Sequence, residues 1–298
     1  MGNGKTDIHL SRRTTPGFLP AQEELCTMDH EPGIFEKFRH RHFSDLMYLA
    51  KGSRPDILFV TTSLAYYVTK WQHWHDVLLV QLFIYLDTVP DMTITGRTTP
   101  NDLDMLSIVA CCDADHAGDP GTSRSTSGGI KMLAAGNTLF PLSWASNRQG
   151  RTAQSTAEAE LVSFNDALRK QLLPLVTRVE ALVGHEVRRL QLCDSTACLG
   201  VIRNGASVAL DYVRKSQRIS LAWLRDVVDE VNINTEYVGT ADNPSDIMTK
   251  HLSQPRFFEL LPTFGCSCER LNLNIIEPRD INWVLISLSG TSAREACV

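Results

Sequence analysis

The sequence predicts an α/β domain whose sheet combines an antiparallel meander with parallel strands, covered by helices and preceded by a small helical unit. The first observation is the order of segments: three short apolar runs, then helix, strand, helix, strand and helix. The second is composition, because 298 residues that are 43% hydrophobic and 21% charged describe a globular chain of one or two domains. The most apolar run, Val77 to Leu86, is about half the ~20 residues that cross a bilayer, so it predicts a buried helix.

The first part of the chain predicts little regular structure. Residues 1–32 are polar, contain Pro16, Pro20 and Pro32, and lack sustained periodicity. We expect a poorly ordered leader with no chemistry of its own.

Three helical stretches follow from Phe43 to about Asp87. Gly52 separates the first two, and Pro55 suits the first turn of a helix. A unit of this size is too short to be stable alone, so residues 33–103 should pack on the domain that follows.

Three strands come next, at Leu106–Cys112, Gly128–Ala135 and Thr138–Trp144. The pair Gly136-Asn137 predicts a tight hairpin between the second and the third. Pro141 cannot donate a hydrogen bond to a neighbouring strand, so the third should lie at the edge of the sheet.

Helices and strands then alternate, on the evidence of apolar spacing and of Gly205 as a helix stop. The expected elements are a helix from about Thr156, a strand at Val187–Cys193, a helix at 195–204, a long amphipathic stretch at 207–231, a strand at Ile233–Val238, and a helix from Asn243-Pro244 to about Leu261.

Acidic residues gather at the ends of these elements. Asp113 and Asp194 each close a strand, and Asp246 lies in the first turn of the last helix. Glu158 and Glu160 lie in the helix that begins at Thr156, on opposite sides of its apolar stripe, so spacing alone does not choose between them. In an α/β sheet, residues at the carboxyl ends of adjacent strands meet at one crevice.

Carboxylates that meet there would repel one another unless a divalent cation held them. Mg²⁺ suits a ligand set of oxygens alone, and two such ions are a common device for phosphodiester hydrolysis. The structural alternative is ordinary strand ends, a helix N-terminal charge and solvated glutamates.

Four blocks, in order, resemble the ribonuclease H domain of copia-type retrotransposon Pol polyproteins. They read CDADHAGDPGTSRSTSGG, STAEAEL, LQLCDSTACLGVI and EYVGTADNPSDIMTKHL. The segment from Phe43 to Asp87 resembles the region between the reverse transcriptase palm and ribonuclease H. The resemblance implies a ribonuclease H-like mixed five-stranded sheet in residues 104–265, a reverse transcriptase thumb or connection remnant in 33–103, and a variable tail in 266–298.

The same resemblance implies hydrolysis of the RNA strand of RNA–DNA hybrids by two Mg²⁺ ions, with Mn²⁺ as a substitute. It puts the catalytic, metal-binding carboxylates at Asp113, Glu160, Asp194 and Asp246. Asp115 is a secondary candidate ligand, because the two-residue period of a strand places it on the same side as Asp113.

Contacts to nucleic acid are expected from a local basic patch, because 29 basic and 34 acidic residues give a net charge of −5. The best patch is Arg214, Lys215, Arg218 and Arg225, with Trp223 between them; the solvated face of an amphipathic helix explains it equally well. Arg148 and Arg151 form a second candidate.

Several features depart from the family pattern. The family usually has an aromatic at His116 and a lysine-histidine pair at Ser216-Gln217, and no reverse transcriptase palm is present. These departures motivate an alternative from a different class, a truncated, catalytically silent remnant that only binds nucleic acid. A transposase or integrase with the same fold is a third possibility, and the absence of an N-terminal His/Cys zinc module argues against it.

The expected setting is intracellular. Eight scattered cysteines without a CxxC pair favour a reducing compartment, and no signal peptide or membrane segment is apparent. We expect a cytoplasmic retroelement particle or the nucleus, with the reverse transcriptase portion of a longer polyprotein as partner.

Overall fold

The computed structural model describes residues 12–17, 31–281 and 284. Most of the expected leader, and residues 282–283 and 285–298 of the expected tail, lie outside the described residues. No helix within the described part of the chain is long and apolar enough to cross a membrane.

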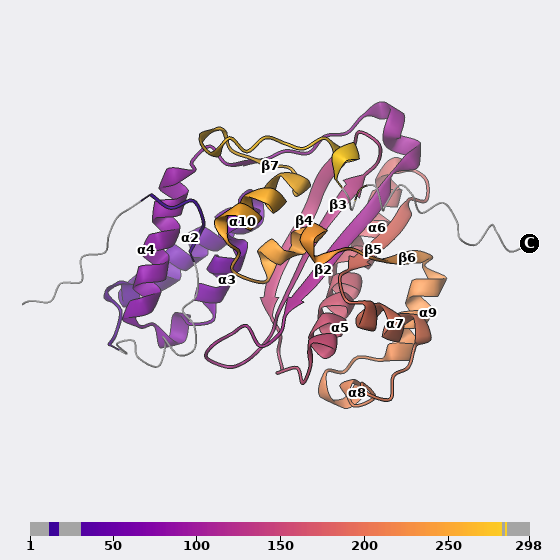
Figure 1. Ribbon diagram of the computed structural model, residues 1–298, viewed down its shortest axis with the longest axis horizontal. Coiled ribbons are helices and arrows are strands. Elements are labelled where there is room, and N and C mark those ends of the chain that lie inside the picture. Colours follow the sequence, from indigo (N-terminus) through magenta and orange to yellow (C-terminus); the bar gives the residue numbers. More distant parts are fainter. Residues whose placement is uncertain (1–11, 18–30, 282–283, 285–298) are drawn as a thin grey trace, which may run out of the picture.

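A five-stranded mixed sheet forms the centre of the molecule (Figure 1). Its strands run in the order β4-β3-β2-β5-β6, with β2, β3 and β4 antiparallel and β2, β5 and β6 parallel. This is the ribonuclease H-like arrangement that the sequence predicts. The strands are β2 (Ser107–Asp115), β3 (Thr126–Ala134), β4 (Leu139–Arg148), β5 (Arg188–Cys193) and β6 (Ile233–Tyr237).

Helices cover both faces of this sheet (Figure 1). The amino-terminal ones are α2 (Arg39–Gly52), α3 (Leu58–Ala65) and α4 (His73–Thr88). The later ones are α5 (Thr156–Ala167), α6 (Leu173–Val183), α7 (Thr196–Asn204), α8 (Val213–Ser216), α9 (Leu221–Glu230) and α10 (Gln254–Leu260).

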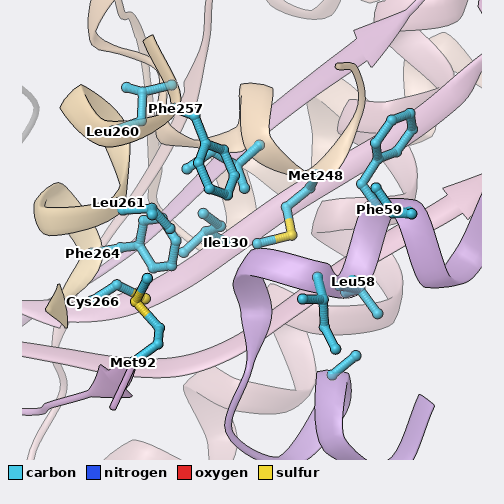
Figure 2. Close-up of a cluster of buried hydrophobic side chains, with 14 of the residues drawn as sticks. Leu58, Phe59, Met92, Ile130, Met248, Phe257, Leu260, Leu261, Phe264 and Cys266 are labelled. Atoms are coloured by element: carbon cyan, nitrogen blue, oxygen red, sulfur yellow. The ribbon is translucent and has the colours of Figure 1, made fainter. Parts of the chain in front are cut away.

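Alternation along β2 divides the core into two layers. Ile108, Ala110 and Cys112 face the layer of α5, α6, α7 and α9, whereas Val109 and Cys111 face the amino-terminal helices and α10. Figure 2 shows the second layer, where side chains from α3, β3 and the carboxyl-terminal elements meet, among them Leu58, Phe59, Met92, Ile130, Met248, Phe257, Leu260, Leu261, Phe264 and Cys266. The amino-terminal helices therefore share one hydrophobic core with the sheet.

Polar contacts also join the amino-terminal helices to β4. The indole nitrogen Nε1 of Trp144 donates a hydrogen bond to the carbonyl of Ala50 at 2.8 Å. The guanidinium of Arg148 lies 3.9 Å from the ring centroid of Tyr66 and pairs with Asp119 at 2.5 Å. This network closes the edge of the sheet against α2 and α3.

Two expected helices are divided in the structure. The amphipathic stretch at 207–231 is interrupted between α8 and α9, where Arg218 has a φ of +60° that a helix cannot contain. The stretch from Asn243 to Leu261 begins as a 3₁₀ helix, η7 (Pro244–Met248), and only later becomes α10. Apolar spacing alone could not locate either break. The two segments on either side of each break bury their apolar residues in the same core layer, so the apolar pattern continues across it.

Between α5 and α6 the helix continues through a π turn at Leu168–Leu172. Pro174, in the first turn of α6, has no N–H to donate to the preceding turn, and the helix widens just before it.

A second, two-stranded sheet involves the expected tail. Strand β1 (Thr93–Ile94) pairs antiparallel with β7 (Cys266–Ser267), and Cys266 and Cys268 are buried. The described part of 266–298 is thus packed against the segment that leads into β2. Two-residue strands are too short to give a pattern in the sequence, so this pairing could not be predicted.

Candidate active site

The first two aspartates are brought together by strand pairing. In the parallel register of β2 and β5, Cys112 lies opposite Cys193. The next residues, Asp113 in β2 and Asp194 just after β5, therefore lie side by side at the carboxyl ends of the two central strands. Asp113 is 1% exposed, so the crevice expected from the sequence is a buried one.

Asp246 reaches the same place from η7. The side chain of Asn243 donates from Nδ2 to the carbonyl of Cys112 at 3.0 Å and accepts at Oδ1 from the N–H of Ser245 at 3.1 Å, which fixes the start of η7 against β2. Gly128 in β3 allows the close approach, since a Cβ there would lie 2.5 Å from Cγ2 of Thr249. A carboxylate oxygen of Asp246 thus lies within 4.8 Å of those of Asp113 and Asp194.

Helix α5 supplies the glutamate. Ser155 caps its first turn, and the hydroxyl of Ser163 donates to the carbonyl of Asp113 at 2.6 Å, which anchors the helix on β2. The carboxylate of Glu160 accepts from the N–H of Ala114 at 3.3 Å. Glu160 therefore faces the aspartates.

Glu158, which the spacing could not separate from Glu160, points elsewhere. Its carboxylate accepts from the N–H of Gln154 at 2.7 Å, from the hydroxyl of Tyr212 at 2.8 Å and from Nε2 of Gln217 at 2.7 Å. Glu158 thus ties the segment around α8 to the beginning of α5, and the fold decides the choice that periodicity left open.

Two groups of side chains could each hold a metal ion. Ligand atoms of Asp113, Asp194 and Asp246 lie within 4.8 Å of one another, and so do those of Glu160, Cys193 and Asp194. Asp194 belongs to both groups and links them. Neither group, among the described residues, contains Asp115.

Crowding of the carboxylates raises their proton affinity. Burial, followed by repulsion from Asp113, raises the pKa of Glu160 to about 10 and the pKa values of Asp194 and Asp246 to about 6 each. Burial also raises the pKa of Asp115, while Lys250 opposes that shift. The site therefore gathers more buried carboxyl groups than its own hydrogen bonds can keep ionised.

Two cations and one hydroxyl approach this charge from η7 and α10. Nζ of Lys250 lies 2.8 Å from Oδ1 of Asp246 and 3.4 Å from Oδ2 of Asp113. Arg256 lies 3.7 Å from the other oxygen of Asp246, and the hydroxyl of Thr249 donates to Asp113. Burial lowers the pKa of Lys250, but Asp113 and Asp246 outweigh it and raise that pKa above its ordinary value.

The donor set fits a hard divalent cation. Asp113, Glu160, Asp194 and Asp246 offer only carboxylate oxygens, the ligands that Mg²⁺ and Mn²⁺ prefer. Cys193, in the second group, is a soft ligand that a hard cation does not favour, so the oxygens of Glu160 and Asp194 would hold Mg²⁺ or Mn²⁺ there. An ion here would remove the repulsion that raises the pKa of these acids.

The residues expected to contact nucleic acid fall into two classes. Arg151, Arg214, Lys215 and Arg218 are exposed. The guanidinium of Arg148 is engaged by Asp119 and Tyr66 within the packing of α3 against β4, and its side chain is 15% exposed. The structure thus presents a basic surface at α8 and the turn after it, and gives Arg148 a packing role.

Sequence reasoning missed Thr249, Lys250 and Arg256 as site residues. The only signal for Lys250 was its spacing of four residues from Asp246, which places the two side chains together once η7 and the turn after it form. Arg256 carries no local signal, because α10 returns to the site only through the tertiary fold.

Comparison with known proteins supports the resemblance to a Pol polyprotein that the sequence blocks indicate. No family model matches the chain. The chain is 25% identical over 247 residues, 81% of its length, to a retrovirus-related Pol polyprotein from transposon TNT 1-94 of Nicotiana tabacum. It spans only 17% of the length of that relative.

A solved structure, the N-terminal RNase H domain of Rv2228c from Mycobacterium tuberculosis fused to maltose-binding protein, is also similar. It covers 48% of this chain and 91% of its own, at 14% identity and a TM-score of 0.29. The resemblance expected from the four sequence blocks is confirmed by the match to the tobacco transposon, since the chain is similar in sequence to part of a retrotransposon Pol polyprotein. The strand order and directions by themselves give the mixed sheet that the sequence predicts.

Proposed function

We propose that the protein hydrolyses the RNA strand of RNA–DNA hybrids with two Mg²⁺ ions, as the ribonuclease H part of a copia-type Pol polyprotein. The observation that supports this most directly is the convergence of Asp113, Asp194 and Asp246, with Glu160 beside them, at the carboxyl ends of β2 and β5. Mn²⁺ would substitute for Mg²⁺, because it accepts the same oxygen ligands.

Each side chain has a distinct part in this proposal. Asp113 is central, since its ligand atom lies within 4.8 Å of those of Asp194 and Asp246 and its carboxylate accepts a hydrogen bond from the hydroxyl of Thr249. Glu160 would complete the ligand set on the Asp194 side. When bound, divalent ions of this kind activate water for attack on a phosphodiester and stabilise the leaving oxygen.

Substrate recognition would rest on the exposed basic residues near α8. Contacts to phosphates and 2′-hydroxyls distinguish a hybrid by its shape and do not require base readout. Glu158 would support these contacts indirectly, because it holds Tyr212 and Gln217 on either side of Arg214 and Lys215. Arg151, in the loop before α5, is a further exposed basic residue that would contact the substrate.

A labelled hybrid with Mg²⁺ tests the proposal. The purified protein should cut the RNA strand, and Asp113→Asn should reduce the rate at least about a hundredfold, as expected when a group that organises the transition-state charge is removed. Asp104→Asn, at an exposed acid in the turn before β2, is the matched control and should retain activity.

The outcomes separate the alternatives. Cleavage that survives Asp113→Asn contradicts the assignment. Hybrid binding without cleavage at any Mg²⁺ or Mn²⁺ concentration supports the binding-only remnant, and strand transfer on DNA ends supports a transposase or integrase.

We also infer a setting within a longer polyprotein. Residues 104–265 would form the ribonuclease H domain, and residues 33–103 the connection to a reverse transcriptase portion that would act as its partner. Co-purification of the chain with such a polymerase portion from retroelement particles, in the cytoplasm or the nucleus, would test this arrangement.

A further inference from the structure

Lys250 stands between two of the site's carboxylates and the solvent. Its side chain is 31% exposed, whereas those of Asp113 and Asp246 are 2% and 5% exposed. Its Nζ reaches one oxygen of each, at 3.4 Å and 2.8 Å. The ammonium therefore bridges Asp113 and Asp246 and covers them from outside.

The other side of the site has no such cation. Among the described residues, no lysine or arginine forms an ion pair with Glu160 or Asp194, whereas Lys250 pairs with both Asp113 and Asp246. The site is thus asymmetric: Asp113 and Asp246 carry a compensating charge, while Glu160 and Asp194 carry none.

We infer that Lys250 competes with the second divalent ion for Asp113 and Asp246, so that the two ions bind with unequal affinity. The first ion would enter on the side of Glu160 and Asp194. The second would need the oxygens that Lys250 engages, and it would have to displace the ammonium. This inference rests on the proposed two-ion site and adds a positioning residue that sets its second affinity.

Local geometry holds Lys250 in place. Asp246 lies in η7, and the spacing of four residues brings Lys250 back over it, while the backbone N–H groups of Thr249 and Lys250 both bond to the carbonyl of Asp246 at 3.2 Å. Arg256 engages the second oxygen of Asp246 and leaves Oδ1 to the lysine. The competing charge is therefore built into the turn that carries the ligand.

Calorimetric titration of the full chain with Mn²⁺ alone tests the inference without nucleic acid. In Lys250→Met the dissociation constant of the second ion should fall by about tenfold or more, equivalent to ~1.4 kcal/mol, while that of the first stays near the wild-type value. Lys250→Arg, which keeps the positive charge, should bind both Mn²⁺ ions with wild-type affinities. Lys250→Gln repeats the test with a polar side chain, should Lys250→Met fold poorly.

Lys170→Met is the matched control. Lys170 forms an ion pair with Asp166 at the same spacing and the same 2.8 Å distance, in the π turn that continues α5, ten residues or about 15 Å beyond Glu160. It should leave both Mn²⁺ affinities unchanged.

Two results would overturn the inference. One is a second dissociation constant that is the same in the wild type and in both charge-removing variants; the other is an isotherm with one ion, or none, in all of them. Because the titration needs no cleavage, a wild-type protein that cuts no RNA overturns the proposed function and leaves the Lys250 result readable. An active protein with unchanged isotherms overturns the role of Lys250 alone.

Discussion

Replacing Glu160 by glutamine should remove activity and yet make the protein more stable. The carboxyl of Glu160 is 4% exposed, and its burial, followed by repulsion from Asp113, raises its pKa from 4.5 to about 10. Without a divalent ion the folded protein therefore keeps this proton at pH 7, whereas the unfolded chain releases it above pH 4.5.

The size of the effect follows from linkage. A group whose pKa is raised by folding costs stability as the pH rises from its unfolded pKa toward its folded pKa. Each pH unit in that window is worth about 1.36 kcal/mol, so the cost between pH 4.5 and pH 7 is at most about 3 kcal/mol. Glutamine does not ionise in either state. Glu160→Gln should therefore raise the free energy of unfolding by up to about 3 kcal/mol at pH 7, and the gain should disappear below pH 4.5.

Urea unfolding followed by circular dichroism, in EDTA at pH 7 and at pH 4, measures this difference. Glu158→Gln is the control on the same helix. Glu158 accepts three hydrogen bonds, so its substitution should cost ~1 kcal/mol and bring no gain in stability at pH 7. A Glu160→Gln protein less stable than the wild type at pH 7, or equally stabilised at both pH values, would refute the reasoning.

Two packing predictions complete the set. Gly128→Ala should cost ~1 to 3 kcal/mol and strongly reduce cleavage, since its Cβ would push Thr249 and η7 away from β3; Gly200→Ala, in α7 with no atom within 4 Å, should be neutral or slightly stabilising. Unaltered cleavage in Gly128→Ala would contradict the close approach. Trp144→Phe should lower stability by ~1 kcal/mol in urea unfolding, because it leaves a carbonyl of α2 without its donor. Trp223→Phe, on the exposed side of α9, should change stability by less than ~0.5 kcal/mol, and an equal effect of both substitutions would contradict the role of the Trp144 bond.

Strand prediction succeeded because it rests on short-range signals. Apolar runs bounded by turn residues located all five strands of the main sheet, and Pro141 placed β4 at its edge. The helices after β5 were harder, because the break at Arg218 depends on one positive φ, which no periodicity reports.

The sequence predicted which residue types would lie at the strand ends of the site, but it predicted less well how their side chains are arranged in space. The sequence placed Asp113 and Asp194 at the ends of two strands, and the parallel pairing of β2 with β5 then made them neighbours. Arg256 approaches Asp246 only because α10 packs back against η7, and no local sequence pattern reports that contact.

The sequence by itself determined the mixed sheet, the acidic residues at its strand ends and the resemblance to a retrotransposon Pol polyprotein, because each depends on residue type and spacing. Only the tertiary structure decided that Glu160 faces the aspartates while Glu158 binds Tyr212 and Gln217. The physical reason is that both glutamates flank the same apolar stripe of α5. Which of them reaches the buried crevice depends on how the whole helix rests on β2, through Ser163, and that angle is a property of the packed core.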